Sequence, residues 1–562
     1  MNNRLIIFGV TFFLLIPSII LPIPIIKTNP NIDPFIGYTL FAPEFSTKTY
    51  LIDLEGNEII TWNSTHIQTL GTYLSEDGKL IRSYLPYINP IFTRPGVTGA
   101  VEMYDLNDTL LWNFEYSTDN FCLHHDIEIL PNGNILMIAW EIKTNEDAIE
   151  EGRIVGGNDD VWPDHIIEVE PTYPTGGNIV WEWHIWDHLI QDYDPTKNNY
   201  GVIKDHPELL DINLKSGIDW NHMNSVDYNE NLEQIIISSR NQNEIWIIDH
   251  STTTEEAAGH TGGRYGQGGD LLYRWGNPQN YNRGDAEDLK FLGQHDAQWI
   301  ESGSPGEGNI LVFINGNPNY EEHYSSVVEI VTPVDEYGIY TIENNLSYGP
   351  EDPIWTYIAD NPSDFYSGTL SGAQRLPNGN TLICSGNNGK FFEVTEDGEI
   401  IWEYTNIYPT PRSNGVFKIR RYSPEYPGLV AYFNRPYTPS PPYGLKTGKI
   451  RNEYIYETAG YDPNGDKLYY KWDWGDEISG WDGPYYSGDT VTASHIWDEK
   501  GSYEIKVKAK DAHGKESLWS DPLPITMPKN EAINLFILFL ERLMERFPTL
   551  EQILLPIYVY LE

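Results

Sequence analysis

The chain has 562 residues, of which 82 are acidic and 36 basic, giving a formal charge of −46 at pH 7. This charge excludes a nucleic-acid binder held by phosphate contacts, because such a protein needs a basic face. A hydrophobic share of 40% and an aromatic share of 13% exclude disorder as the main state. Two cysteines are too few for a disulfide framework, and no CxxC or Cys/His pattern indicates a zinc site.

Residues 1–27 are expected to be a targeting segment. No charged residue occurs from Leu5 to Ile26, and Arg4 and Lys27 flank this apolar run. The run is long enough for the core of a signal peptide and, with its extension, approaches a membrane span. A cleaved signal peptide and an uncleaved membrane anchor both remain open, and both place the rest of the chain outside the cytoplasm. A buried core helix is less favoured, because the run lies at the terminus and nothing polar interrupts it.

Residues 37–430 predict an all-β fold, a six-bladed β-propeller. Short β-branched and aromatic runs alternate with Asn-Gly, Asp-Gly and Gly-Gly turns. Four strands per unit, recurring over tens of residues, are typical of a propeller. Five complete units are expected, opening near Leu70, His125, His222, His295 and Ser371. Their last strands carry tryptophan at matching places, namely Trp112, Trp181, Trp275, Trp355 and Trp402.

The two ends of this region are expected to form the sixth blade together. Residues 38–62 would supply its outer strands and residues 415–422 its inner strand, which closes the ring without a free sheet edge. The units are unevenly spaced, so the blades must carry insertions. Those at roughly 141–165 and 185–220 are long enough to be functional.

Three histidines open inner-blade hairpins, which indicates a site at one mouth of the channel. Because the innermost strands line the channel, His125, His222 and His295 are expected to project toward one point. Arg240 ends the second strand of the His222 hairpin, and Asn224 would share the strand face of His222. Purely structural histidines and a histidine-only metal site are the alternatives. Arg240 argues against the metal, since a fixed cation repels one, and favours an anionic substrate.

Asp126 and Asp296 follow two of these histidines, where they could orient the rings in either chemistry. Asp296 could instead turn outward, so it is assigned no role.

The motifs around these residues resemble those of the arylsulfate sulfotransferases, or arylsulfotransferases. The resemblance covers about residues 37–430 and rests on three stretches: HHDIEILPNGN, WNHMNSVDYN with the following ISSRNQNEIWIID, and GQHDAQWI. It implies an extracytoplasmic six-bladed propeller that moves a sulfuryl group from an aryl sulfate ester to a phenol through a sulfated histidine. It implies no nucleotide donor and no cofactor, and the chain shows no Gly-rich phosphate loop with a following lysine.

The resemblance also implies a role for each residue. His295, in GQHD, would be the nucleophile, and His222 and Arg240 would contact the sulfuryl oxygens. His125 matches the remaining catalytic histidine, although His124 lies beside it. Asn224 and His124 are expected to contact the substrate. The chemistry suits these residue types, because a neutral imidazole is a nucleophile and sulfuryl transfer, like phosphoryl transfer, needs donors at its equatorial oxygens.

The C-terminal part predicts a second, smaller domain. Residues 438–449 form a proline-rich linker, and residues 450–528 show the short alternating strands of a β-sandwich. The WDWGD and GSYEIKVKAKD stretches resemble a PKD-type immunoglobulin-like domain, which implies spacing or adhesion. Four acids there could bind calcium, but turn-forming, solvated acids are favoured: Asp462, Asp466, Asp473 and Asp476. Residues 531–562 indicate a short helical tail. It could lie on a membrane surface, but packing on the sandwich or an oligomer contact is favoured.

The sequence therefore favours a secreted or membrane-anchored sulfotransferase whose partners are a small aryl sulfate and a phenolic acceptor. A non-enzymatic surface propeller that binds glycans or proteins is the second hypothesis, and a metal-dependent hydrolase is the third. Cys122 and Cys384 would lie in opposite blades and are expected to be unpaired core thiols.

Overall fold

The computed structural model describes residues 26–28, 32–154, 160–316, 323–408, 414–424, 426–433, 436–462, 465–517 and 519–527, with 540, 542, 543 and 546. It divides the chain into two compact units, residues 1–424 and 425–562. The expected targeting segment, except for its last two residues, and most of the expected helical tail lie outside the described residues. Within the described ranges, no helix is long and apolar enough to cross a membrane.

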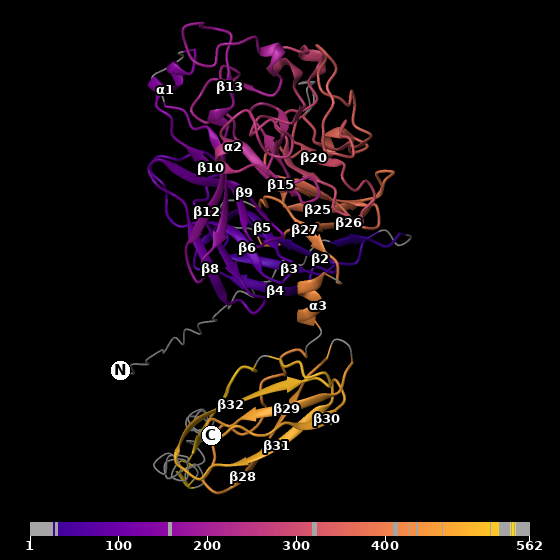
Figure 1. Cartoon of the computed structure of the whole chain (residues 1–562). Coiled ribbons are helices and arrows are strands. Elements are labelled where there is room, and N and C mark those ends of the chain that lie inside the picture. Colours follow the sequence, from indigo (N-terminus) through magenta and orange to yellow (C-terminus); the bar gives the residue numbers. More distant parts are fainter. Residues whose placement is uncertain are drawn as a thin grey trace, which may run out of the picture. The chain divides into compact units, whose positions relative to one another are not determined.

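Unit 1 is built from four-stranded antiparallel sheets in which consecutive strands pair (Figure 1). The described residues of unit 1 contain six sheets of this kind, one of which gains a fifth strand at its edge. The first sheet comprises β5 (Ile67–Leu74), β6 (Leu80–Leu85), β7 (Ala100–Tyr104) and β8 (Leu110–Glu115). The second comprises β9 (Phe121–Ile129), β10 (Ile135–Glu141), β11 (Asp164–Pro171) and β12 (Gly177–His184). The third comprises β15 (Met223–Asn229), β16 (Gln234–Ser239), β17 (Glu244–Asp249) and β18 (Tyr273–Trp275).

The next two sheets repeat this pattern. They comprise β19 (His295–Trp299), β20 (Ile310–Ile314), β21 (Ser326–Ile330) and β22 (Trp355–Tyr357); and β23 (Gly372–Arg375), β24 (Thr381–Ser385), β25 (Lys390–Val394) and β26 (Ile400–Thr405).

The sixth sheet joins the two ends of unit 1, as the sequence predicts. Its strands are β27 (Arg420–Tyr422), β2 (Tyr38–Phe41), β3 (Lys48–Ile52) and β4 (Glu58–Asn63), and β2 pairs with β27 from Tyr38–Tyr422 to Leu40–Arg420. In Figure 1 the indigo β2 lies beside the orange β27. The last strand of the region, β27, thereby covers the free edge of its first strand, β2.

Tryptophan side chains join each sheet to the next around the whole ring. The indole Nε1–H of one outer-strand tryptophan per sheet donates to a backbone carbonyl of the following sheet at 2.7–2.9 Å. The pairs are Trp62–Asp105, Trp112–Gly176, Trp183–Gly269, Trp275–Pro350, Trp355–Glu396 and Trp402–Leu54. Because a buried indole N–H needs an acceptor, each bond fixes how neighbouring sheets pack.

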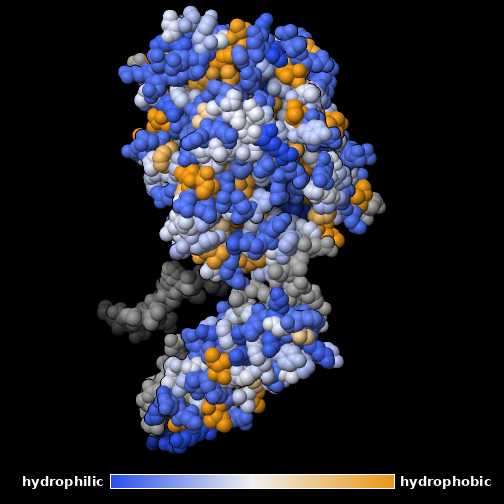
Figure 2. Space-filling model, in the orientation of Figure 1, coloured by the Kyte–Doolittle hydropathy of each residue, from blue (hydrophilic) through white to orange (hydrophobic). Residues whose placement is uncertain are grey.

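The core of unit 1 lies between neighbouring sheets. Strands such as β17 are buried along their full length, in keeping with their runs of isoleucine. Cys122 and Cys384 are buried and unpaired, which confirms that prediction. On the faces that Figure 2 shows, the described surface is largely hydrophilic and its apolar residues form scattered small patches.

Short helices and a parallel strand pair occur in the connections of unit 1. These elements are α1 (Asn145–Glu150), η1 (Ile185–Asp187), β13 (Leu189–Ile190), η2 (Ile203–Asp205), β14 (Leu210–Asp211), α2 (Thr254–Ala257), η3 (Pro278–Tyr281), η4 (Ala286–Asp288), η5 (Pro362–Asp364) and η6 (Gly386–Asn388). The segment from β12 to β15 is the longer of the two expected insertions, and β13 pairs with β14 inside it.

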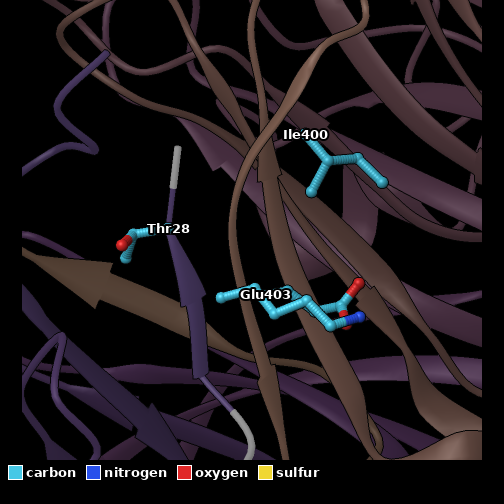
Figure 3. A pocket seen from close by; sticks show the side chains of 4 residues that line it. Thr28, Ile400 and Glu403 are labelled. Carbon is cyan, nitrogen blue, oxygen red and sulfur yellow. The ribbon is translucent and has the colours of Figure 1, made fainter. Parts of the chain in front are cut away.

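A short strand, β1 (Ile26–Thr28), adds to the outer edge of the fifth sheet by pairing with β26. Lys27 Nζ contacts Glu403 Oε1 at 2.8 Å. A hollow of about 380 Å³ lies here, lined by Lys27, Thr28, Ile400 and Glu403 (Figure 3). None of the predicted catalytic residues lines it.

Unit 2 contains α3 (Pro427–Phe433) and a β-sandwich. One sheet pairs β28 (Glu453–Ala459) with β31 (Thr490–Ile496). The other contains β29 (Leu468–Asp473), β30 (Asp482–Tyr485), β32 (Gly501–Lys510) and β33 (Leu523–Met527), in the order β30-β29-β32-β33. Alternating exposure along β32 and β33 matches strands with one buried face. The predicted fold class, an all-β propeller followed by a small β-sandwich, is confirmed.

Candidate active site

The three predicted histidines come from three neighbouring sheets and meet. His125 lies on β9, His222 immediately precedes β15, and His295 begins β19. The rings of His125 and His222 meet edge to face with centroids 4.6 Å apart. Electrostatic interactions also couple His125 to His222, His124, His295 and Arg240. The predicted catalytic set therefore gathers in one region of unit 1.

The strand register corrects one detail of the repeat. Bonds between neighbouring sheets place Ile127, Val226 and Ala297 at equivalent positions, because the residue before each one accepts from the backbone of the next sheet. Asp126 Oδ2 accepts from Val226 N at 3.3 Å, Ser225 Oγ from Ala297 N at 2.9 Å, and Asp296 Oδ2 from Ala373 N at 3.0 Å. Counting back two residues reaches His125 and His295 in two sheets but Asn224 in the third. The prediction that all three histidines share one repeat position was wrong, because each hairpin carries a β-bulge at this point and His222 lies two residues further upstream.

His295 is held in one tautomer by a buried amide. Asn315 Nδ2 donates to the carbonyl oxygens of Ser367 and Leu370 at 2.7 and 2.9 Å, which turns its Oδ1 toward the ring. His295 Nδ1 lies 2.6 Å from Asn315 Oδ1 and 3.2 Å from the carbonyl oxygen of Gly293. Both neighbours only accept, so Nδ1 carries the proton and the lone pair is on Nε2. No contact recorded for the described residues occupies that Nε2.

Burial and the nearby Arg240 guanidinium lower the pKa of His295 to about 3. His295 is 3% exposed, and its ring is neutral at pH 7. A neutral imidazole with a free Nε2 lone pair is a competent nucleophile.

His222 is paired with an acid that the sequence analysis did not identify. Its Nδ1 lies 2.5 Å from Asp219 Oδ2, and the amide of Asn241 donates to the carbonyl oxygen of Asp219 at 2.9 Å. A carboxylate on one ring nitrogen orients the imidazole and stabilises the positive charge formed when the other nitrogen takes up a proton. This arrangement suits proton transfer at Nε2 of His222.

His125 is positioned by its neighbour His124. The two Nδ1 atoms are 2.8 Å apart, and His124 Nε2 lies 3.0 Å from Asp164 Oδ1. His124 stacks on Trp140 with centroids 4.0 Å apart and is 1% exposed. Burial lowers the pKa of both histidines well below the usual value, so both rings are neutral at pH 7. This burial favours His124 as a support of His125 over the substrate contact that was expected of it.

Arg240 supplies the positive charge of the site. Its backbone N–H donates to the carbonyl oxygen of His222 at 3.2 Å, which places the two residues across the β15–β16 hairpin. The backbone at Gly293 passes close by, since a Cβ there would lie 3.5 Å from Arg240 Nη2. No ion pair or hydrogen bond of its guanidinium is recorded within the described residues, so its five donors are available to an anion.

Asn224, Asp126 and Asp296 make contacts that hold neighbouring parts of the fold together. Asn224 is fully buried, and its Nδ2 donates to the carbonyl oxygen of Gln294 at 2.8 Å, which ties β15 to the residue before His295. Asp126 and Asp296 face Lys418 at 2.6 and 3.1 Å, and Asp296 also pairs with Arg420 at 2.9 Å. Both acids therefore join the inner strands to β27 and its preceding loop, and within the described part of the chain neither is recorded bonding a ring of the three predicted histidines.

Backbone strain gathers in the same place. His125, His222 and Asp296 have φ angles of 53°, 54° and 53°, in the left-handed region that non-glycine residues seldom adopt. Such conformations cost of order 1–3 kcal/mol each and cluster at active sites. Gly96 covers His125 from the β6–β7 connection, because its carbonyl oxygen accepts from His125 N at 2.8 Å.

Sequence analysis missed Asn315, Asp219, Asp164 and Gly96. Asp219 stands three residues before His222, a local signal that could have been used. Asn315 is followed by Gly316 and looks like a turn dipeptide, so no local pattern marks it.

Two other clusters bring together ligand types for a metal. Within the described residues these are His188, His260 and Asp270 in unit 1, and Asp462, Asp466 and Asp511 in unit 2. Of the four acids considered for calcium, Asp473 and Asp476 are engaged elsewhere. Asp473 accepts from Gly475 N at 3.0 Å, and Asp476 lies 2.9 Å from His495 Nε2.

Comparison with known families gives two matches. The model of the arylsulfotransferase (ASST) family matches residues 45–408, and the PKD domain model matches residues 452–521. Among curated proteins, none matches the chain significantly.

Solved structures give more distant likenesses. The PKD domain of an M14-like peptidase from Thermoplasmatales archaeon SCGC AB-540-F20 is 43% identical, covering 17% of this chain and 96% of that one, with a TM-score of 0.16. The hydrazine synthase of Kuenenia stuttgartiensis is 11% identical, covering 53% of this chain and 81% of that one, with a TM-score of 0.28. At these TM-scores, neither supports an inference about fold or function.

Proposed function

Given that the chain belongs to the arylsulfotransferase family, we propose that it moves a sulfuryl group from an aryl sulfate ester to a phenol through a sulfated His295, without a nucleotide donor. The observation that carries this proposal is the tautomer of His295. Its Nδ1–H is held by Asn315 Oδ1, its Nε2 lone pair is free, and the unpaired guanidinium of Arg240 lies nearby.

In the first half-reaction, His295 Nε2 attacks the sulfur of the ester. The N–S bond forms as the aryl O–S bond breaks, and the departing aryl oxygen takes a proton from His222. In the second, the oxygen of the acceptor phenol attacks the same sulfur, its proton passes to His222, and the N–S bond breaks. Both rings return to their starting state.

Arg240 binds the sulfuryl oxygens in both steps, because a guanidinium combines a fixed positive charge with N–H donors that match the charge developing there. The family resemblance assigns His222 to the same oxygens, but its contact with Asp219 favours it as the proton carrier. His125 completes the donor set around the sulfuryl group. We place this reaction outside the cytoplasm, as the two matched domain families and the uncharged N-terminal run suggest.

The experiment is a turnover assay on the full chain with a chromogenic aryl sulfate, with and without a phenol acceptor. We expect dye release that the acceptor accelerates and that needs no nucleotide. Arg240→Ala should lower kcat/KM by roughly 10²–10³-fold, the loss typical of one oxyanion donor. His206→Ala is the control, because His206 is exposed and, among the described residues, the hydrogen bond recorded for its side chain is to Glu208. Equal rates in the Arg240→Ala and His206→Ala variants would contradict the assignment.

The role of His222 has its own test. Asp219→Asn should slow donors with poorly acidic phenol leaving groups much more than donors with acidic ones, because only the former need a proton. A uniform loss across the donor series would return His222 to a purely oxygen-binding role.

A further inference from the structure

A second cluster of histidine and carboxylate side chains lies outside the active site. His188 follows η1 in the β12–β15 insertion, whereas His260 and Asp270 lie in the connection between α2 and β18. Asp270 Oδ1 is 2.8 Å from Nδ1 of both histidines. All three ligand atoms lie within 4.8 Å of one another. Two chain segments about 70–80 residues apart thus meet at one carboxylate.

The hydrogen bonds of His188 leave a lone pair facing a lone pair. His188 Nε2 lies 2.9 Å from the carbonyl oxygen of Ala257, which can only accept, so Nε2 carries a proton. In the neutral ring, Nδ1 then has only a lone pair, and it faces an oxygen of Asp270 at 2.8 Å. Two acceptors at this distance repel each other unless a proton or a metal ion lies between them. His260 Nδ1 converges on the same oxygen from the solvent side.

We propose that His188, His260 and Asp270 form a binding site for one divalent transition-metal ion, Zn²⁺ by the chemistry of its donors. Two imidazole nitrogens and one carboxylate oxygen are a typical Zn²⁺ ligand set, with water in the fourth position. His188 is fully buried, whereas the His260 side chain is 59% exposed, which gives both an anchored ligand and an entry path. The bond from His188 Nε2 to a backbone carbonyl is the outer-shell support that metal-binding histidines usually have.

The surroundings hold these ligands rigidly. Trp183 stacks on His188 with a 7° angle between the rings, and its Nε1–H donates to the carbonyl oxygen of Gly269 at 2.7 Å. A Cβ at Gly269 would lie 2.0 Å from the carbonyl oxygen of Ala257 and 2.7 Å from His188 Nε2, so only glycine fits. The loop that carries His260 closes on itself, since Gly269 N donates to the carbonyl oxygen of Gly259.

The ion would fasten the insertion that leads to the active site. The carbonyl oxygen of His188 accepts from Leu210 N at 2.9 Å, beside the β13–β14 pair. The same insertion continues to Asp219, the partner of His222. The ion joins this insertion to the β17–β18 connection, and it takes no part in the sulfuryl chemistry.

The test uses the tag-free full chain, stripped with a chelator and titrated with Zn²⁺. We expect one bound ion per chain and a Zn²⁺-dependent rise in the unfolding temperature. His260→Ala, at an exposed position that leaves the core intact, should weaken Zn²⁺ binding at least tenfold and remove the rise. His206→Ala and His295→Ala should retain both, as matched controls for a surface histidine and for the active-site histidines.

Asp270→Asn provides a second variant that keeps the shape of the side chain. It should also lose the ion and, once folded, resemble the chelated chain in stability. Zn²⁺ bound equally by the wild-type and His260→Ala chains would overturn the proposal. Binding lost in His295→Ala would overturn it as well, because the ion would then lie among the active-site histidines.

Discussion

At His295, one side-chain amide decides which ring nitrogen keeps the lone pair that the proposed reaction uses. Asn315→Asp would place a carboxylate beside Nδ1, where it stabilises the imidazolium and raises the pKa of His295. The acidic limb of the kcat/KM profile should therefore move to higher pH, with activity recovering as pH rises. Asn315→Leu removes the acceptor. It should raise the activation free energy for kcat/KM by about 1–3 kcal/mol at every pH. Superimposable profiles for the wild type and Asn315→Asp would contradict the tautomer assignment.

The buried, neutral state of His295 also links folding to pH. Its pKa is about 3 in the folded chain and about 6.5 when unfolded, so between these values the unfolded state binds more protons. This contribution to stability is complete above pH 6.5 and declines as pH falls toward 3. The stability lost through His295 between pH 7 and pH 5 is about 2 kcal/mol.

Urea unfolding at the two pH values measures this effect as a difference. His295→Gln should lose less stability than the wild type by that amount, since the other titrating groups are common to both chains. An equal loss in both chains would show that His295 is not buried and neutral.

At the scale of elements, the β6–β7 connection holds His125 through Gly96. Its φ is +99°, and a Cβ would lie 1.9 Å from Cε1 of the ring. Gly96→Ala should therefore displace His125 and lower turnover as well as stability. Gly133→Ala is the matched control, because Gly133 has φ +86° but open space around its Cβ. It should show the backbone strain alone, of about 1 kcal/mol, with normal turnover. Equal turnover in the two variants would contradict the contact with His125.

The inner hairpins also show which features could be predicted from the sequence. Turn dipeptides and β-branched runs predicted the strands, because these signals are local. The place of His222 was wrong by two residues, since a β-bulge shifts the register without leaving a mark in the sequence. Asn315 could not be predicted, because its contact with His295 joins the end of β20 to the start of β19 and depends on the fold.

At the scale of the whole molecule, a buried ion-pair cluster joins the last strand of unit 1 to the inner strands. Lys418 is 5% exposed and contacts both Asp126 and Asp296. Lys418→Met would leave these acids with less compensation, and breaking a buried pair costs about 3–5 kcal/mol. Lys79→Met removes a half-exposed pair with Asp77 and should cost at most about 1 kcal/mol. Similar unfolding midpoints for the two variants would argue against this cluster as the closure of the ring.

The closed ring was predictable because residues at both ends of the region carry halves of one repeat. The six tryptophan hydrogen bonds between sheets could be predicted only in part from the sequence. Five tryptophans at matching places were noted, but the donor in the second sheet is Trp183, whereas Trp181 bonds the hydroxyl of Thr252. Which of two nearby indoles reaches the next sheet depends on strand twist, and composition does not record it.

The central claim is that His295 Nε2 carries the sulfuryl group. Mass spectrometry of the full chain, incubated with an aryl sulfate and no acceptor, tests it most directly. We predict one added sulfuryl group per chain, located on His295 by peptide mapping and discharged when a phenol is added. His295→Ala should show neither label nor transfer. A label on another residue, or undiminished turnover in His295→Ala, would contradict the account.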